Sequence, residues 1–218
     1  MKHRIRRLIA GDEAALDGFL EQHPDSSMFL RSNLRRAGLV DRGEPYQGVY
    51  VAAFEGDAIV GAVAHFWNGM VVVQAAGHVE TLGLEAVALS GRKIVGLSGP
   101  GDQVRRAHLA LGLAEREAFD DNTDDLFALD LDGLKVPPEL AAGRFVVRRP
   151  EAVELPLVSD WSVAFNCEAL GFAPSEELRR YCADQMIRLQ EEAAHFVLEA
   201  AGAPVAYAAF NAALPDMV

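Results

Sequence analysis

The first 131 residues alternate between two hydrophobic periodicities, and each predicts a different kind of element. Apolar residues at helical spacing predict helices at residues 11–22, 28–37, 79–90 and 102–111. Short apolar runs bounded by turn residues predict strands at residues 3–10, 48–54, 58–67, 70–75, 93–97 and 126–131. Asn68-Gly69 is the strongest hairpin signal, so residues 48–75 are expected to form an antiparallel meander of three strands.

The opening pattern returns in the second half of the chain. A segment with two prolines, residues 132–143, separates the halves. After it the pattern predicts a strand at 144–149, helices at 152–170 and 175–193, and strands at 195–200 and 204–211. Ser175, followed by acidic residues, fits a helix N-cap. The order β-α-α-β-turn-β thus occurs twice, and we expect a first domain at 1–131, a linker at 132–143 and part of a second domain at 144–218.

The order of expected elements in residues 1–131, β-α-α-β-β-β-α-β-α-β, resembles that of the GNAT (GCN5-related N-acetyltransferase) superfamily. Three stretches, HPDSSMFLRSNLRRAGL at 23–39, residues 48–73 and FNAALPD at 210–216, resemble bacterial proteins with two tandem GNAT-like domains. The resemblance implies an α/β (α+β) fold with a mixed, mostly antiparallel sheet flanked by helices. It also implies one full, degenerate repeat followed by half a repeat.

The half repeat leaves an open edge in the expected second sheet. Its last strand, residues 204–211, reads PVAYAAFN and is followed by no further strand before residue 218. An exposed apolar edge is a liability that must be paired or covered. We expect this edge to pair with the sheet of the first repeat or with a second copy of the chain, which makes a homodimer a candidate assembly.

Composition narrows the classes of partner. The chain has 218 residues, 50% of them apolar, and a formal net charge of −12. Phosphate backbones and anionic membranes are bound through clustered Lys and Arg, so this charge disfavours nucleic acid and membrane surfaces as partners. No apolar run is long enough to span a membrane, and Cys167 and Cys182 belong to no cluster with zinc spacing. We therefore expect a cytoplasmic protein without a metal site.

The resemblance implies acetyl-CoA as the cofactor and a small-molecule or peptide amine as the acceptor. In the family, a Q/R-x-x-G-x-G/A loop follows the fourth strand, and its backbone N–H groups hold the pyrophosphate at a helix N-terminus. The sequence QAAGHV at 74–79 supplies Q-x-x-G, but Val79 stands at the second small position, where its branched side chain is expected to hinder a phosphate. The cofactor-binding residues that the resemblance implies are Val73, Gln74, Gly77, His78 and Ser98.

Two residues are candidates for catalysis. In the family, a helix that ends in Gly-Phe carries a Tyr proposed to protonate the departing thiolate. Gly112-Leu113 takes the place of Gly-Phe here and His108 that of the Tyr, so the resemblance implies His108 as proton donor, with a partly exposed helix histidine as the alternative. Ser98 lies in GLSGP, which nearly matches the G-x-S-x-G nucleophile elbow, although a strand-to-helix turn explains the same residues.

Two classes of function stay open at this point. The first is an acetyl-CoA-dependent N-acetyltransferase acting on an amine, inactive as this chain if the missing second cofactor loop is required. The second is a non-catalytic module for binding or dimerisation that kept the fold, because a fold alone does not determine a function. A serine hydrolase acting through Ser98 is a third alternative. Binding of acetyl-CoA separates the first class from the others.

Overall fold

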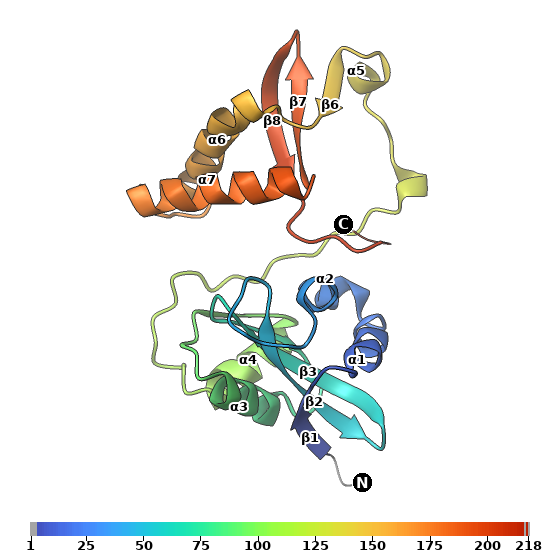
Figure 1. The fold of residues 1–218 in the computed structure, drawn as a ribbon, viewed down its shortest axis with the longest axis vertical. Helices are drawn as coiled ribbons and strands as arrows, with labels where there is room; N and C mark the ends of the chain where they lie inside the picture. The colour runs from blue at the N-terminus through green and yellow to red at the C-terminus, as the bar shows by residue number, and fades with distance from the viewer. Residues whose placement is uncertain (1–3, 216, 218) are drawn as a thin grey trace. The chain divides into compact units, whose positions relative to one another are not determined.

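Residues 4–215 and 217 are described by the computed structural model, in which the chain forms two units (Figure 1). Unit 1 runs to Ala128 and also includes Ala212–Met217, and unit 2 comprises Leu129–Asn211. Each unit has its own sheet and its own helices.

Unit 1 is built on one mixed sheet whose strand order follows the sequence. The strands are β1 (Arg4–Arg7), β2 (Gly48–Glu55), β3 (Ala58–Phe66), β4 (Met70–Gln74) and β5 (Gly96–Ser98). The helices are α1 (Glu13–Leu20), α2 (Pro24–Ala37), α3 (Val79–Ser90) and α4 (Gly101–Ala110). Neighbouring strands are antiparallel except for β4 and β5, which run parallel. The parallel pair is therefore separated along the chain by a crossover that contains α3.

Strand alternation buries both faces of the unit 1 sheet. On β2, Val51 and Ala53 face one side whereas Tyr50 and Phe54 face the other, and all four are buried. The Tyr50 side packs against α1 and α2, and the Val51 side packs against α3 and α4. A sheet covered on both faces needs continuous apolar strands, which explains the run VYVAAF at 49–54.

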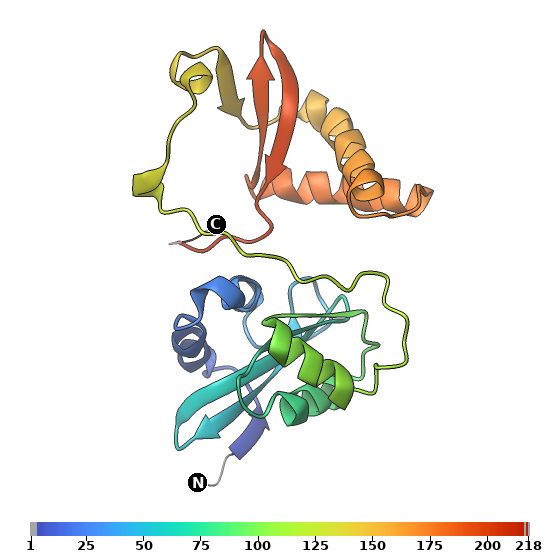
Figure 2. The same ribbon diagram turned by 180° about the vertical axis from the view of Figure 1, so that it is seen from behind.

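Unit 2 is built on a smaller, antiparallel sheet. A 3-10 turn (Leu131–Gly133) and the short helix α5 (Pro138–Ala141) precede it. The strands are β6 (Phe145–Arg148), β7 (His195–Ala200) and β8 (Ala203–Ala209), in that order across the sheet. A second 3-10 turn (Ala152–Glu154), α6 (Leu155–Glu168) and α7 (Glu176–Glu191) connect β6 to β7. The two helices lie together on one side of the sheet (Figure 2). The core between helices and sheet contains Val158, Met186 and Val197.

The fold class expected from the sequence is confirmed. The structure has a mixed, mostly antiparallel sheet and a second, antiparallel sheet, each flanked by helices. The meander expected at 48–75 is present as β2, β3 and β4, with a turn at Asn68-Gly69. Ser175 caps α7, because its hydroxyl accepts a hydrogen bond of 3.1 Å from the backbone N–H of Leu178.

The prediction of a strand at 126–131 is wrong. Residues 114–130 form neither helix nor strand, and Leu126 and Phe127 are exposed. An alternating apolar pattern yields a strand only where a neighbouring strand accepts its hydrogen bonds, and β5 offers such an edge over only three residues. The described part of unit 1 therefore follows the expected element order through α4 and lacks the last strand.

Two other boundaries differ from expectation for local reasons. The strand expected at 93–97 is instead β5, because the N–H of Val95 donates to the carbonyl of Gly69 and the parallel register with β4 begins one residue later. The helix expected at 28–37 begins earlier, at Pro24, whose fixed φ suits the first turn of a helix.

Candidate functional site

The ends of β4 and β5 place two helix N-termini at one edge of the unit 1 sheet. The strands are parallel, so both run toward the same edge, where residues 75–78 lead from β4 into α3 and residues 99–100 lead from β5 into α4. The two helices contact each other. The first N–H groups of each helix have no partner within the helix and carry partial positive charge. This edge is therefore suited to an anionic or carbonyl-bearing ligand.

The turn between β5 and α4 is pressed against the backbone of β4. Gly99 has a φ of 141°, and a Cβ at this position would collide with the carbonyl oxygen of Val73. Ser98, the residue before it, is half-buried and lies opposite Val72 in the parallel register. Gly99, the second glycine of GLSGP, thus allows this turn to lie close to β4. The residues form a strand-to-helix turn, which is the alternative to a nucleophile elbow.

The side chain of Gln103 on α4 is hydrogen-bonded to the first backbone N–H after β4, that of Ala75. Its side-chain oxygen accepts a hydrogen bond of 2.6 Å from the N–H of Ala75, and the side chain is buried. In the GNAT superfamily, which the sequence resembles, backbone donors of the fourth strand hold the acyl carbonyl. Here the N–H already has an acceptor inside the protein. The sequence analysis missed Gln103, and its one signal is a polar side chain on the helix face that also carries the buried Ala107.

Arg106 joins α4 to the first turn of α3. Its guanidinium donates to both carboxylate oxygens of Glu80, at 2.7 and 2.9 Å, and to the carbonyl oxygen of Ala76 at 2.8 Å. The hydrogen bonds from Arg106 hold the pKa of the Glu80 carboxyl below its usual range. Glu80 also accepts from its own backbone N–H. The N-terminus of α3 thus carries an internal anion, which Arg106 neutralises.

Gln74 points away from the N-terminus of α3. Its side-chain oxygen accepts a hydrogen bond of 2.6 Å from the hydroxyl of Ser26 on α2. Along β4, Val73 faces the α3 side and Val72 the opposite side, so Gln74 lies on the side that α1 and α2 cover. The buried Gln74 side chain ties β4 to α2, and the structure does not bring it together with Gly77 and His78.

The remaining loop residues leave room next to the backbone. A Cβ on Gly77 would meet no atom within 4 Å. His78 takes the left-handed conformation, with φ of 63°, and is the N-cap residue of α3. Val79 is fully buried in the core beneath α3. The expectation that Val79 hinders a phosphate is therefore wrong, because its side chain turns inward and not toward the outside of the loop.

His108 lies in the last turn of α4 and not at the loop. It follows Gln103 by five residues, which places it about 7.5 Å further along the helix axis and about 140° around it. The side chain is half-buried. The structure brings together Val73, Ala75, Gln103, Arg106 and Glu80, and it leaves His108 outside that group.

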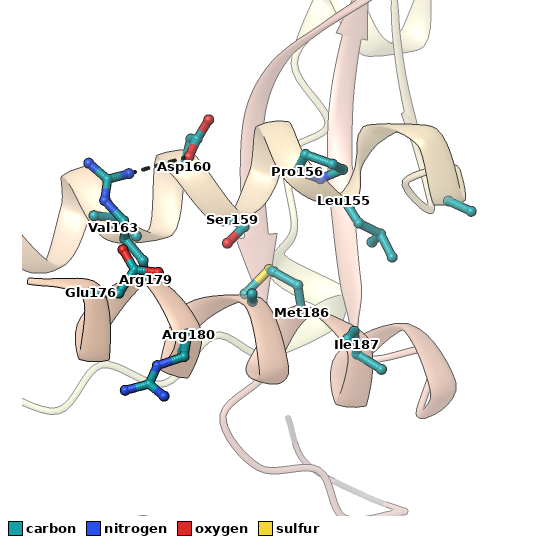
Figure 3. A pocket seen from close by; sticks show the side chains of 12 residues that line it. Leu155, Pro156, Ser159, Asp160, Val163, Glu176, Arg179, Arg180, Met186 and Ile187 are labelled. Carbon is teal, nitrogen blue, oxygen red and sulfur yellow. Dashed lines mark ion pairs between the residues drawn. The ribbon is translucent and has the colours of Figure 1, made fainter.

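A groove lies between α6 and α7 in unit 2 (Figure 3). It has a volume of about 530 Å³, and Leu155, Val163 and Met186 are among its apolar lining residues. Near one end, Arg179 and Asp160 form an ion pair at 3.9 Å. None of the residues predicted from the sequence to bind or react with a ligand lines it.

Comparisons with known proteins identify no family for this chain. No family model matches it, and no curated protein matches it. Among solved structures, the crystal structure of a possible acetyltransferase from Clostridium difficile 630 is similar over 60% of this chain and 100% of that chain, with 15% sequence identity and a TM-score of 0.35. A likeness at this level fixes neither the family nor the activity of the chain.

The described residues provide two further findings. No helix among them is long and apolar enough to cross a membrane. No group of three or more His, Cys, Asp or Glu side chains among them is placed to hold a metal ion.

Proposed function

We propose that unit 1 binds acetyl-CoA at the loop 75–78 and that the chain transfers the acetyl group to an amine, as the resemblance to the GNAT superfamily implies. The observation that supports this proposal is the parallel pair β4 and β5, each followed directly by a helix that begins at the same sheet edge. Ligands in α/β folds bind outside the carboxyl ends of parallel strands, where helix N-termini meet them.

The loop residues fit such a ligand in two respects. The space beside Gly77 is open, so a phosphate oxygen is able to approach the backbone there. Val79 is turned into the core, so its side chain does not occupy the outside of the loop. When bound, the cofactor supplies an acyl thioester. Backbone groups of Val73 and Ala75 would hold the acyl carbonyl, and the Ala75 N–H would then have to exchange the Gln103 oxygen for it.

The proposed acceptor is a small-molecule or peptide amine. Transfer forms a bond between the amine nitrogen and the acyl carbon, breaks the carbon–sulfur bond and releases one proton from the amine. The net charge of −12 favours the approach of cationic substrates over anionic ones. The proton donor to the thiolate that the resemblance implies is His108, which lies in the last turn of α4.

An isosteric pair of substitutions tests this site. Gly77→Asp adds a negative charge beside the loop, and Gly77→Asn adds the same volume without the charge, in space where a Cβ meets no atom within 4 Å. We expect the unmodified chain to bind acetyl-CoA in calorimetry with a micromolar dissociation constant. Gly77→Asp should weaken binding by at least about tenfold, which is about 1.4 kcal/mol, and Gly77→Asn should not. Equal affinities in the two variants would contradict the proposed place of the phosphates.

A non-catalytic module is the second candidate function, and one observation favours it. Gln103 and Arg106 already satisfy the Ala75 N–H and the Ala76 carbonyl, so the edge is closed by the protein's own side chains. If this closure is permanent, acetyl-CoA does not bind the unmodified chain. Binding by the unmodified chain, followed by transfer of the acetyl group to an amine, would contradict the non-catalytic alternative.

A further inference from the structure

The two units repeat the same set of side-chain hydrogen bonds at the start of their sheets. In unit 1, Arg6 donates to both oxygens of Asp12, at 2.6 and 2.8 Å, and Asp12 also accepts from the N–H of Ile9 at 2.9 Å. In unit 2, Arg148 donates to both oxygens of Glu154, each at 2.7 Å, and Glu154 accepts from the N–H of Glu151 at 2.7 Å. The spacing along the chain is identical, six residues from the arginine to the carboxylate.

The hairpins that follow are also alike. The register of β2 and β3 shifts between Ala53 and Phe54, and that of β7 and β8 shifts between Leu198 and Glu199. Ala53 lies opposite Ile5 of β1, and Leu198 lies opposite Val147 of β6. These pairings place the two sheets in residue-by-residue correspondence.

The correspondence shows a sheet face whose residues are buried in unit 1 and half-buried or exposed in unit 2, where we call it the bare sheet face. In unit 1, Ala53 and Val63 are fully buried beneath α3, and β4 pairs with the outer edge of β3. In unit 2 the residue at the place of Val63 is Ala208, which is exposed, and Val147 is 55% exposed. The helices α6 and α7 pack on the opposite side, against Val197 and Tyr207. Among the described residues, no strand lies beyond β8 in its sheet.

We propose that the outer edge of β8 and the bare sheet face form an interaction surface for a β-strand followed by a helix. The strand pairs antiparallel with β8, as β4 does with β3, and the helix lies across Val147, Leu198 and Ala208, as α3 does in unit 1. The chemistry that fits is an apolar strand with a helix that presents one apolar face. The bare sheet face and the apolar face of the partner helix would bury each other, which removes hydrocarbon from water.

A second copy of the chain fits this surface less well. Two β8 strands that pair across a twofold axis satisfy each other's backbone groups. Such a pair joins the sheets edge to edge and leaves both bare faces in water. A strand with a following helix satisfies the edge and covers the face together, which is the solution that residues 70–90 provide in unit 1.

The test joins a strand–helix segment to the full chain. The segment is a second copy of residues 70–90, attached after Val218 by a flexible Gly/Ser linker of about 15 residues, which holds it at roughly millimolar effective concentration. Hydrogen exchange at Ala203–Ala209 is the readout, and exchange in β2 and β3 serves as the internal reference for folding. We expect the fused segment to slow exchange at the outward amides of β8 by at least about tenfold.

A matched fusion in which the added copies of Val71 and Val73 are replaced by Asp should leave exchange in β8 unchanged. Val147→Asp, at a position that is already 55% exposed, should reverse the protection in the first fusion while unit 1 stays protected. Two results would overturn the proposal. One is equal exchange in both fusions. The other is an unfused chain that is dimeric by light scattering with its β8 amides already protected, which identifies a second copy as the occupant.

Discussion

The side-chain oxygen of Gln103 accepts a 2.6 Å hydrogen bond from the N–H of Ala75, at the point where β4 ends. This bond ties α4 to β4 across the sheet edge where the family resemblance implies an acyl carbonyl. A carbonyl oxygen and the Gln103 oxygen are the same kind of acceptor, so under the proposed function a ligand would compete with the Gln103 side chain for the Ala75 N–H. The proposal therefore links the stability of unit 1 to its affinity for acetyl-CoA.

Replacement of Gln103 by Ala should move these two properties in opposite directions. The variant leaves the buried N–H of Ala75 without its acceptor, which should destabilise unit 1 by about 1–3 kcal/mol. It also removes the competitor, so we expect tighter binding of acetyl-CoA. Urea denaturation and calorimetry on the same protein measure the two effects. An affinity that falls together with stability would contradict the competition between Gln103 and the ligand.

The Arg106–Glu80 pair should contribute less than its geometry suggests. The two side chains are 39% and 43% exposed, so water and salt screen the pair. A double-mutant cycle with Arg106→Ala and Glu80→Ala should give a coupling free energy of up to about 1 kcal/mol that decreases as salt increases. A coupling several times larger that is insensitive to salt would show that water is excluded from this edge.

Stability at acidic pH should reflect Asp12 and Glu154. The hydrogen bond from Arg6 lowers the pKa of Asp12 from 3.8 to about 2, and the hydrogen bonds from Arg148 lower the pKa of Glu154 from 4.5 to about 2. A carboxyl whose pKa is lowered by folding stabilises the folded state fully above its unfolded pKa, and this contribution is lost as the pH falls through its folded pKa.

We therefore expect the stability of each unit to decline between about pH 5 and pH 2. Asp12→Asn should flatten the decline in unit 1 and leave unit 2 unchanged, and Glu154→Gln should do the reverse. Unfolding curves followed by Trp67 in unit 1 and Trp161 in unit 2, the two tryptophans of the chain, separate the units. A decline in unit 1 that persists unchanged in Asp12→Asn would show that other carboxyls control it.

The face of the unit 1 sheet beneath α3 and the corresponding face of the unit 2 sheet should differ in their tolerance of a polar atom. Val51 is fully buried on the face that α3 covers, so Val51→Thr places a hydroxyl in the core and should cost unit 1 about 1–3 kcal/mol. Val147 is 55% exposed, so the same change there should alter the stability of unit 2 by less than about 0.5 kcal/mol. The same fluorescence-detected unfolding measures both. A large cost at Val147 would mean that this face is already covered in solution.

The fold was predictable where a strand pairs with the strand next to it along the chain. The turn at Asn68-Gly69 and the apolar runs on both sides of it specify a local antiparallel hairpin, so β3 and β4 were expected where they occur. The strand at 126–131 has the same kind of pattern, but its existence depends on a distant neighbour that the pattern does not show. The periodicity of a sequence shows which side chains alternate between two faces. It does not show whether a neighbouring strand has a free edge with which the segment can pair.

The candidate site was less predictable for the same reason. The Q-x-x-G sequence located the loop, but the direction of each side chain depends on packing. Val79 faces the core, and Gln74 faces Ser26 on α2. Gln103 and Arg106 reach the loop from a helix that lies more than twenty residues later in the sequence. A buried glutamine on an amphipathic helix is a weak signal by itself, and only the fold shows which backbone N–H it meets.

Amide chemical-shift mapping during titration with acetyl-CoA tests the proposed function most directly, because it reports both binding and its place. We expect saturable shifts at the amides of Ala75, Gly77, His78 and Glu80, together with loss of the Gln103 hydrogen bond to Ala75. The absence of shifts at saturating acetyl-CoA in both the unmodified chain and Gln103→Ala would contradict a cofactor site in unit 1. Shifts confined to residues of unit 2 would contradict it as well.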